Sequence, residues 1–267
     1  IHSDSERIFE QYDRAGVDDL VFSQPPYIGF ADAEATAKAN YSLLEVINNN
    51  DRAHGLAALP VAAGGEAAAN EFERALDLGY NGGAIETRSG GIAPDDREAE
   101  PILEIADRTG APLFIHPKLH DSVGEHSLDD TYRLNAIFGR EAALSKTICD
   151  LIHGDVLDSY PNLTPVVHHL GGNIASMMGR VHLHNDIGRW PGMDNMKSFA
   201  EFKRQLEDRV YVDTAGFFGY HAPVRATIEE FPASNIIFGT DSPYEPRTSE
   251  ELKRFVEVVS DLTSEAD

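Results

Sequence analysis

The sequence predicts an α/β protein, a (β/α)₈ TIM-like barrel whose first strand is missing from the chain. Strand-like apolar runs alternate with helix-like segments along all 267 residues, and no shift in composition marks a linker. The runs are continuously apolar, as expected for strands buried on both faces of a parallel sheet. Seven such runs are present and the chain opens on a helix. Residues 1–267 are therefore predicted to form a single domain, of a length usual for such barrels.

The predicted strands are short runs of β-branched and other apolar residues, bounded by Gly, Pro or polar residues. They span 20–23, 55–59, 83–86, 112–116, 163–169, 210–214 and 235–240. A doubly wound sheet is the competing fold. A dinucleotide-binding sheet would show Gly-x-Gly-x-x-Gly after its first strand. The chain instead continues with Gln24-Pro-Pro-Tyr-Ile-Gly29, which argues against that class of enzyme.

The predicted helices show apolar residues at helical spacing, as Ile8, Phe9 and Tyr12 do in the first of them. Gly79 and Gly110 follow two of these segments, in the position where glycine commonly ends a helix. The predicted helices span 4–15, 32–48, 66–78, 96–108, 130–157, 174–183, 196–206, 222–231 and 249–262.

The chain is strongly acidic. Its 45 acidic residues against 22 basic ones give a formal net charge of -23, so nucleic acid and anionic membranes would be repelled. High acidity with few lysines indicates a halophilic protein, and an acidic mesophilic enzyme is the alternative. No apolar stretch reaches the ~20 residues of a membrane span, and no signal peptide is visible. These features predict a cytoplasmic protein.

Three predicted strands end in side chains that bind metals or transfer protons. The segments are Leu113-Phe-Ile-His-Pro117, Val166-Val-His-His-Leu-Gly-Gly172 and Phe238-Gly-Thr-Asp-Ser-Pro243. The carboxyl ends of barrel strands meet at one rim, where catalytic groups sit. We therefore expect His116, His169 and Asp241 to converge on a metal site with a nearby base.

Each of these residues also has a structural interpretation. His116 could be a strand-end histidine bonded to a backbone carbonyl, and Asp241 could cap a turn, because Asp-Ser-Pro is good turn chemistry. Neighbouring side chains on a strand point to opposite faces, so only one of His168 and His169 is expected to face the barrel interior. We place His169 inward and His168 between strand and helices. Asp213 is a weaker candidate, a partner for nearby backbone.

Three further residues are weaker candidates for contact with an anionic substrate. Arg88 follows a predicted strand and could clamp a carboxylate. Lys118 and His120 lie in the polar loop after His116. Solvated loop residues are the competing interpretation of both.

The chain resembles the amidohydrolase superfamily, specifically the amidohydrolase-2 branch to which aminocarboxymuconate semialdehyde decarboxylases belong. The strand-end segments carry the resemblance, together with Tyr12-Asp-Arg-Ala-Gly-Val-Asp-Asp-Leu-Val-Phe22 and the run from Asp158 to Gly172. The resemblance implies a distorted barrel with a divalent metal, zinc first and manganese as the alternative. It implies His116 and Asp241 as metal ligands and His169 as the acid/base. It also implies a small carboxylated or cyclic substrate that undergoes hydrolysis or nonoxidative decarboxylation. The protein is further expected to be a homodimer or homotetramer.

The sequence departs from that family at its start. The first strand of the family carries Asp-x-His-x-His, whose histidines bind the metal, and nothing before Asp4 can supply it. We expect an upstream segment to have been omitted, because a barrel without one strand exposes two unpaired edges. A metal-free barrel that binds a ligand or a partner subunit is the alternative. In a third possibility, His116, His169 and Asp241 never meet in an ordinary α/β protein.

Overall fold

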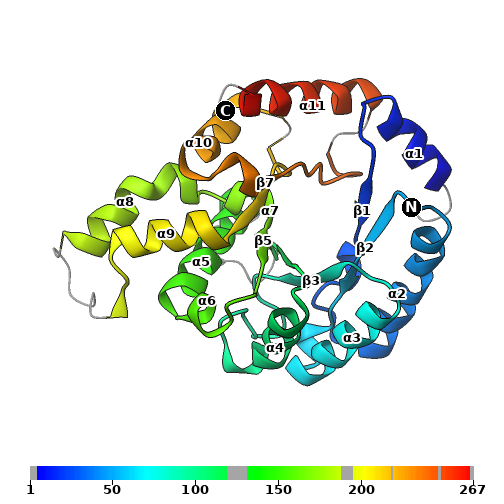
Figure 1. The fold of residues 1–267 in the computed structure, drawn as a ribbon, viewed down its shortest axis with the longest axis horizontal. Helices are drawn as coiled ribbons and strands as arrows, with labels where there is room; N and C mark the ends of the chain where they lie inside the picture. Colours follow the sequence, from blue (N-terminus) through cyan, green and yellow to red (C-terminus); the bar gives the residue numbers. More distant parts are fainter. Residues whose placement is uncertain (1–4, 119–130, 188–194, 218, 246–247, 265–267) are drawn as a thin grey trace.

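Seven parallel strands form one sheet in the order of the chain, from β1 to β7. The computed structural model describes residues 5–118, 131–187, 195–217, 219–245 and 248–264. Within them, the strands are β1 (Leu20–Phe22), β2 (Ala53–Ala58), β3 (Gly82–Glu86), β4 (Leu113–His116), β5 (Pro165–Val167), β6 (Tyr211–Asp213) and β7 (Ile236–Ile237). The sheet curls and the helices surround its outer face (Figure 1). The predicted barrel with one strand fewer is confirmed.

The helices lie within a few residues of their predicted positions, except that the short helix His168–Gly171 begins within the strand predicted over 163–169 and that the helix predicted over 130–157 is divided. They are α1 (Ser5–Asp13), α2 (Ala33–Asn48), α3 (Gly65–Asp77), α4 (Glu100–Thr109), α5 (Arg140–His153), α6 (Val156–Ser159), α7 (His168–Gly171), α8 (Ile174–Asp186), α9 (Phe199–Arg209), α10 (His221–Glu230) and α11 (Ser249–Ser264). Short 3₁₀ turns occur at Pro25–Tyr27, Val61–Ala63, Arg97–Ala99 and Ala233–Asn235. None of the described helices is long and apolar enough to cross a bilayer.

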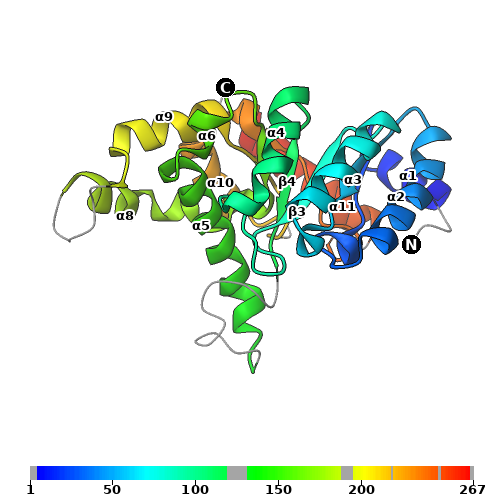
Figure 2. The same cartoon turned by 90° about the horizontal axis from the view of Figure 1, so that it is seen from below.

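One predicted helix is divided in the structure. The segment expected as a single helix over 130–157 contains a π-helical turn at Asn135–Gly139, then α5, then α6. Asp155 adopts a left-handed conformation with φ of 58°, which separates α5 from α6. Together with the preceding π-helical turn, α5 extends beyond the sheet (Figure 2).

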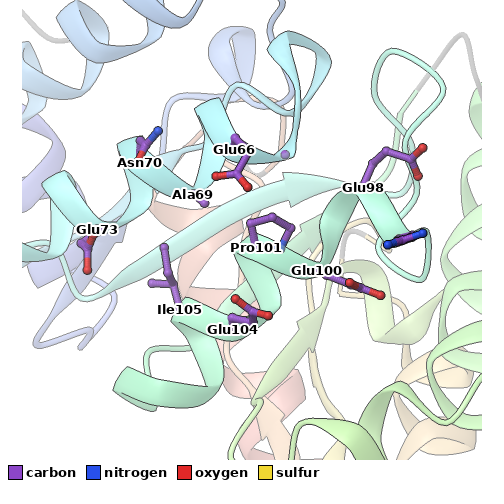
Figure 3. Close-up of a pocket in the computed structure, with 11 residues that line it drawn as sticks. Glu66, Ala69, Asn70, Glu73, Glu98, Glu100, Pro101, Glu104 and Ile105 are labelled. Atoms are coloured by element: carbon purple, nitrogen blue, oxygen red, sulfur yellow. The ribbon is translucent and has the colours of Figure 1, made fainter.

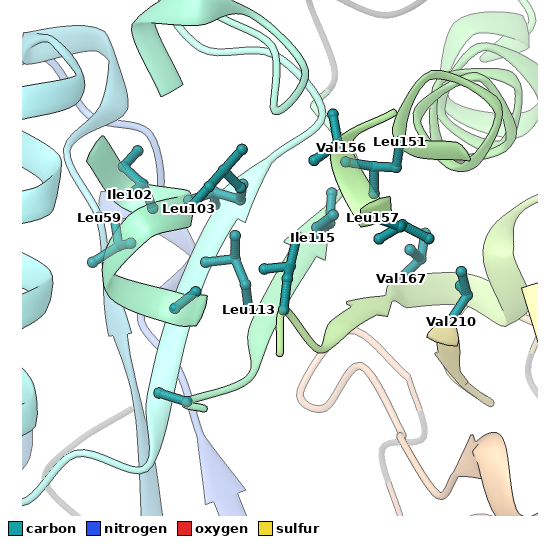
Figure 4. Close-up of a cluster of buried hydrophobic side chains, with 14 of the residues drawn as sticks. Leu59, Ile102, Leu103, Leu113, Ile115, Leu151, Val156, Leu157, Val167 and Val210 are labelled. Carbon is teal, nitrogen blue, oxygen red and sulfur yellow. The ribbon is translucent and has the colours of Figure 1, made fainter. Parts of the chain in front are cut away.

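The main core lies between the sheet and the outer helices. Leu113 and Ile115 of β4 point outward and are almost completely buried. Figure 4 shows them among side chains of α4, α5 and α6, such as Ile102 and Leu151. Phe114 belongs to a separate small cluster, on the other face of the sheet. Because successive strand residues alternate between faces, His116 shares the inner face with Phe114.

The two ends of the described sheet, β1 and β7, are not paired with each other. Side chains of α1, α11 and the chain after β7 pack together between them. Phe9 and Tyr12 of α1 pack in one cluster with Leu252 of α11 and Phe238, which follows β7. The hydroxyl of Tyr12 is 2.7 Å from Oγ1 of Thr240. Helix α1 therefore packs between the β1 end of the curled sheet and the chain that follows β7.

We predict that Gly83→Ala lowers the free energy of unfolding by about 1–3 kcal/mol, as is usual for overpacking a core. A Cβ at residue 83 would lie 2.9 Å from the ring of Phe72 and 3.0 Å from Leu59. Chemical denaturation measures the change, and adding Phe72→Leu should restore part of the loss. Gly179→Ala is the control, because a Cβ there meets no atom within 4 Å and alanine is the better helix former. Equal stability of the Gly83→Ala and wild-type proteins would contradict the packing described.

Candidate active site

Strand β4 delivers His116 to the inner rim of the sheet. Its Nδ1 is 2.9 Å from the carbonyl oxygen of Pro117. A carbonyl can only accept, so Nδ1 carries the proton and Nε2 keeps its lone pair. Burial, aided by the neighbouring imidazoles of His168 and His169, lowers the pKa of His116 to about 3. The ring is therefore neutral at ordinary pH.

The two histidines after β5 do not alternate as the strand pattern predicts. Strand β5 ends at Val167, and His169 and Leu170 both have φ of 55°, in the left-handed region. The ring centroids of His168 and His169 lie 5.4 and 6.3 Å from that of His116. The expectation that His168 packs away from the site is wrong, because the left-handed turn brings both rings to it.

His169 is held in place at three points. Its Nδ1 lies 3.0 Å from Oε1 of Glu141, and its backbone N–H donates to Oδ1 of Asp213 at 3.0 Å. Gly216, with φ of 84°, lies so close that a Cβ there would be 2.5 Å from the ring. Burial alone lowers the pKa of His169, but the hydrogen bond and charge of Glu141, with Asp213 and Asp241, outweigh it and raise the pKa. The imidazole is therefore fixed in orientation, and its raised pKa favours the protonated form.

Asp213 ends β6 and links the site to the neighbouring strand. Its buried carboxylate accepts hydrogen bonds from the N–H groups of His169 and Ala215, at 3.0 and 3.2 Å, and pairs with Nδ1 of His168. Burial raises the pKa of Asp213, but the charge and hydrogen bond of His168 outweigh it, and the pKa is lowered. Its predicted role as a partner for backbone is confirmed, and its pairing with His168 is an addition.

Asp241 lies after β7, in a left-handed conformation with φ of 50°. Its carbonyl oxygen accepts from the N–H groups of Tyr244 and Glu245 at 2.8 and 3.0 Å. Burial raises the pKa of its carboxyl, and the charges of His169 and His168 partly oppose the shift. The carboxyl is therefore in the electrostatic range of both histidines.

Sequence analysis missed Glu141, which the first turn of α5 brings to His169. Gly172, at φ of 70°, makes the approach possible, because a Cβ there would lie 2.1 Å from the carbonyl oxygen of Glu141. Oγ of Ser145 donates to the carbonyl of Gly171 at 3.2 Å and accepts from the N–H of Asn173 at 2.7 Å. The only local signal was an acidic residue that begins an otherwise apolar helix face.

The weaker candidates are engaged elsewhere or lie outside the description. Arg88 donates from Nη1 to the carbonyl of Gly91 at 2.8 Å, within its own loop. Nζ of Lys118 lies 2.8 Å from Oε2 of Glu86, which also accepts from Oγ of Ser89 at 2.6 Å. His120 lies outside the described residues. A role for these residues in substrate binding stays a prediction.

The donor chemistry fits part of a metal site. His116 presents the neutral Nε2 that metals bind, and its Nδ1–H is fixed by a backbone carbonyl, as is usual for metal-binding histidines. The carboxylate of Asp241 lies within electrostatic range of His169. The described residues nevertheless contain no group of three or more His, Cys, Asp or Glu side chains arranged to hold a metal.

Two surface hollows lie away from this site. One, of about 780 Å³, is on the outer layer between α3 and the start of α4, and glutamates such as Glu66, Glu73 and Glu104 line it (Figure 3). The other, of about 470 Å³, lies between α5 and α8 and is mostly apolar. Neither is lined by His116, His169 or Asp241, so the chemistry of the rim, rather than hollow size, identifies the candidate site.

We predict that His116 makes the metal-free protein less stable as the pH falls. Its folded pKa of about 3 lies below the ordinary value of 6.5, so only the unfolded chain takes up this proton between those values. The contribution to the free energy of unfolding then decreases by about 1.4 kcal/mol per pH unit. Denaturant titrations between pH 4.5 and 6.5, with chelator present, measure the slope. The slope should be shallower in His116→Gln, and parallel slopes would contradict the assignment.

We predict that Glu141→Gln lowers the pKa of His169, because burial is then no longer opposed by the carboxylate charge. Nuclear magnetic resonance of ¹⁵N-histidine measures the ring pKa, and His169→Asn identifies the signal. Glu73→Gln removes the same charge from an exposed pair with Arg108 and should leave the signal unchanged. An unchanged His169 pKa in Glu141→Gln would exclude the contact as its cause.

Comparison with known proteins supports the fold and assigns the family. A 2-amino-3-carboxymuconate-6-semialdehyde decarboxylase of Dictyostelium discoideum is 32% identical over 144 residues, 53% of this chain and 39% of that protein. A gamma-resorcylate decarboxylase of Polaromonas sp. is 26% identical over 255 residues, 87% of this chain and 75% of that protein. The chain thus spans well under half of the first relative and three quarters of the second.

Solved structures share the fold. A dihydroxybenzoic acid decarboxylase of Polaromonas sp., with bound manganese and the inhibitor 2-nitroresorcinol, superposes with a TM-score of 0.79 at 21% identity, covering 97% of this chain and 85% of that one. A 5-carboxyvanillate decarboxylase of Sphingomonas paucimobilis gives 0.77 at 24% identity, covering 96% and 78%. The amidohydrolase family model matches residues 12–263. This chain therefore belongs to the amidohydrolase family.

Proposed function

We propose that the protein is a metal-dependent nonoxidative decarboxylase that acts on a small carboxylated aromatic compound. The observation that carries the proposal is that two neighbouring imidazoles differ in protonation. His116 is neutral with a free Nε2, whereas the contact with Glu141 fixes His169 and raises its pKa. Related proteins that act on resorcylate, carboxymuconate semialdehyde and carboxyvanillate support decarboxylation over hydrolysis. The whole-protein activity is inferred from a chain that spans only part of these relatives.

In this proposal His116 and Asp241 hold a divalent metal, with further ligands from outside the described residues. Manganese is bound in the Polaromonas structure, whereas zinc, the first choice from the sequence, has no comparable support here. When bound, the metal supplies positive charge that draws electron density from the substrate oxygens. The remaining chemistry belongs to the chain itself.

His169 supplies the proton in the proposed reaction. Loss of CO₂ breaks the bond between a ring carbon and its carboxylate, the electron pair stays on the ring carbon, and a proton must take the place of CO₂. Because Nδ1 of His169 is engaged by Glu141, Nε2 is the nitrogen left to deliver that proton. The raised pKa of His169 favours the protonated form that such a donor requires.

A metal-free barrel that binds a ligand remains the second candidate. Its support is that the described residues hold no three-donor metal group. Metal content of protein expressed from its full reading frame distinguishes the two candidates. About one manganese or zinc per chain favours the enzyme. A folded protein that takes up neither metal favours the binding barrel.

We predict that His169→Asn reduces CO₂ release by about 10²–10⁴-fold, the usual contribution of a general acid, while bound metal stays near the wild-type level. His116→Gln should instead lower metal content and activity together. The assay follows the change in ultraviolet absorbance when 2,6-dihydroxybenzoate or a related aromatic acid loses its carboxylate. Elemental analysis measures the bound metal. Wild-type turnover in His169→Asn would remove this residue from the proposed role.

A further inference from the structure

Arg140 is partly buried, and its Nε is a buried donor without a partner among the described residues. It is the first residue of α5 and directly precedes Glu141, whose carboxylate contacts His169. Its Nε is buried and has no hydrogen-bond partner, and no ion pair involves its guanidinium among the described residues. An unpaired buried donor destabilises a folded protein, and binding of a ligand is one way in which such a donor gains a partner.

Two other partly buried arginines, Arg74 and Arg209, have several partners each. Arg74 contacts both carboxylate oxygens of Glu71 at 2.7 Å. Arg209 donates to the backbone carbonyls of Leu157, Tyr160 and Leu163, at 3.0 to 3.2 Å. Within the part of the chain that the structure describes, Arg140 has neither kind of partner.

Arg140 lies at the rim of the candidate site, because the next residue of α5, Glu141, has its Oε1 3.0 Å from Nδ1 of His169. The positive charge of Arg140 makes a small contribution to the lowered pKa of His116, at the end of β4, and slightly opposes the rise that burial causes in the pKa of Asp241, after β7. The guanidinium is therefore near enough to act on groups from two separated strands. Lys118, the other cation near the end of β4, is already paired with Glu86 at 2.8 Å. Arg140 is thus the unpaired cation of the described rim.

We propose that the guanidinium of Arg140 binds the carboxylate of the substrate, which makes it a binding and specificity-determining residue. A guanidinium matches a carboxylate with two parallel N–H donors, a fit that an ammonium group lacks. The overall charge of -23 repels anionic molecules, so an anionic substrate needs a local cation to be held. This inference concerns the site of the proposed function, but it is a statement about binding and does not depend on turnover.

The test compares two ligands that differ only in the carboxylate, 2,6-dihydroxybenzoate and resorcinol. Calorimetry measures both dissociation constants for the wild type, Arg140→Met and Arg140→Lys, with and without added manganese. Arg140→Met keeps an apolar stem and removes the charge. It should weaken 2,6-dihydroxybenzoate binding by about 10- to 100-fold and leave resorcinol binding unchanged, because a charge-assisted hydrogen-bonded pair is lost. Arg140→Lys should fall between the two.

Arg133→Gln is the matched control, since it removes one positive charge from an exposed position seven residues earlier, and it should leave both constants unchanged. Thermal unfolding of Arg140→Met should match or exceed the wild type, because an unsatisfied buried donor is removed. Equal dissociation constants for wild type and Arg140→Met would overturn the proposal. An equal loss of affinity for both ligands in Arg140→Met would also overturn it. The same holds if only Lys118→Gln weakens 2,6-dihydroxybenzoate binding, or if the wild type binds no aromatic carboxylate.

The outcome is separable from that of the proposed function. A wild type that binds 2,6-dihydroxybenzoate through Arg140 but releases no CO₂ would contradict decarboxylation and leave the anion site intact. Conversely, CO₂ release that is unaffected in Arg140→Met, with unchanged affinity, would contradict the anion site alone.

Discussion

The organisation of the site depends on the buried carboxylate of Asp213. A carboxylate is costly to bury unless several donors compensate it, and here two backbone N–H groups and one imidazole do so. These bonds join the end of β6 to the turn that follows β5. They also hold His169 in a left-handed conformation that strand geometry alone would not favour. Without Asp213, His168 would lose its carboxylate partner, and the ring of His169 would be held only by Glu141 and the close approach of Gly216.

The apolar core and the candidate site occupy different parts of the fold. The apolar core lies between the strands and the outer helices, while the charged groups of the site gather where β4, β5 and β6 end. Helix α5 is the exception, because it takes part in both regions. Ile148 and Leu151 of α5 are buried in the core, and Glu141 reaches the rim only because Gly172 has no side chain. The fold therefore uses a glycine contact to bring a helix into an active site.

The sequence was sufficient for the architecture, because continuous apolar runs and helical spacing report burial directly. It placed His116 correctly, since a strand residue keeps its alternation to the end of the strand. It failed at His168, because the left-handed turn after Val167 arises from a hydrogen bond to Asp213, 44 residues from His169. Glu141 was missed for a similar reason. Charged residues at the start of a helix normally face water, and only the contact with His169 shows that Glu141 does not.

The π-helical turn at Asn135–Gly139 has a consequence for how such a site can vary. A π-turn holds one residue more than an α-turn, so it absorbs a single-residue insertion that would otherwise rotate the following side chains by about 100°. Arg140 and Glu141 follow it immediately. In evolutionary terms, the segment before α5 can change its length by one residue while the residues of α5 keep their direction. A change of length before α5 is thereby uncoupled from the contact between Glu141 and His169.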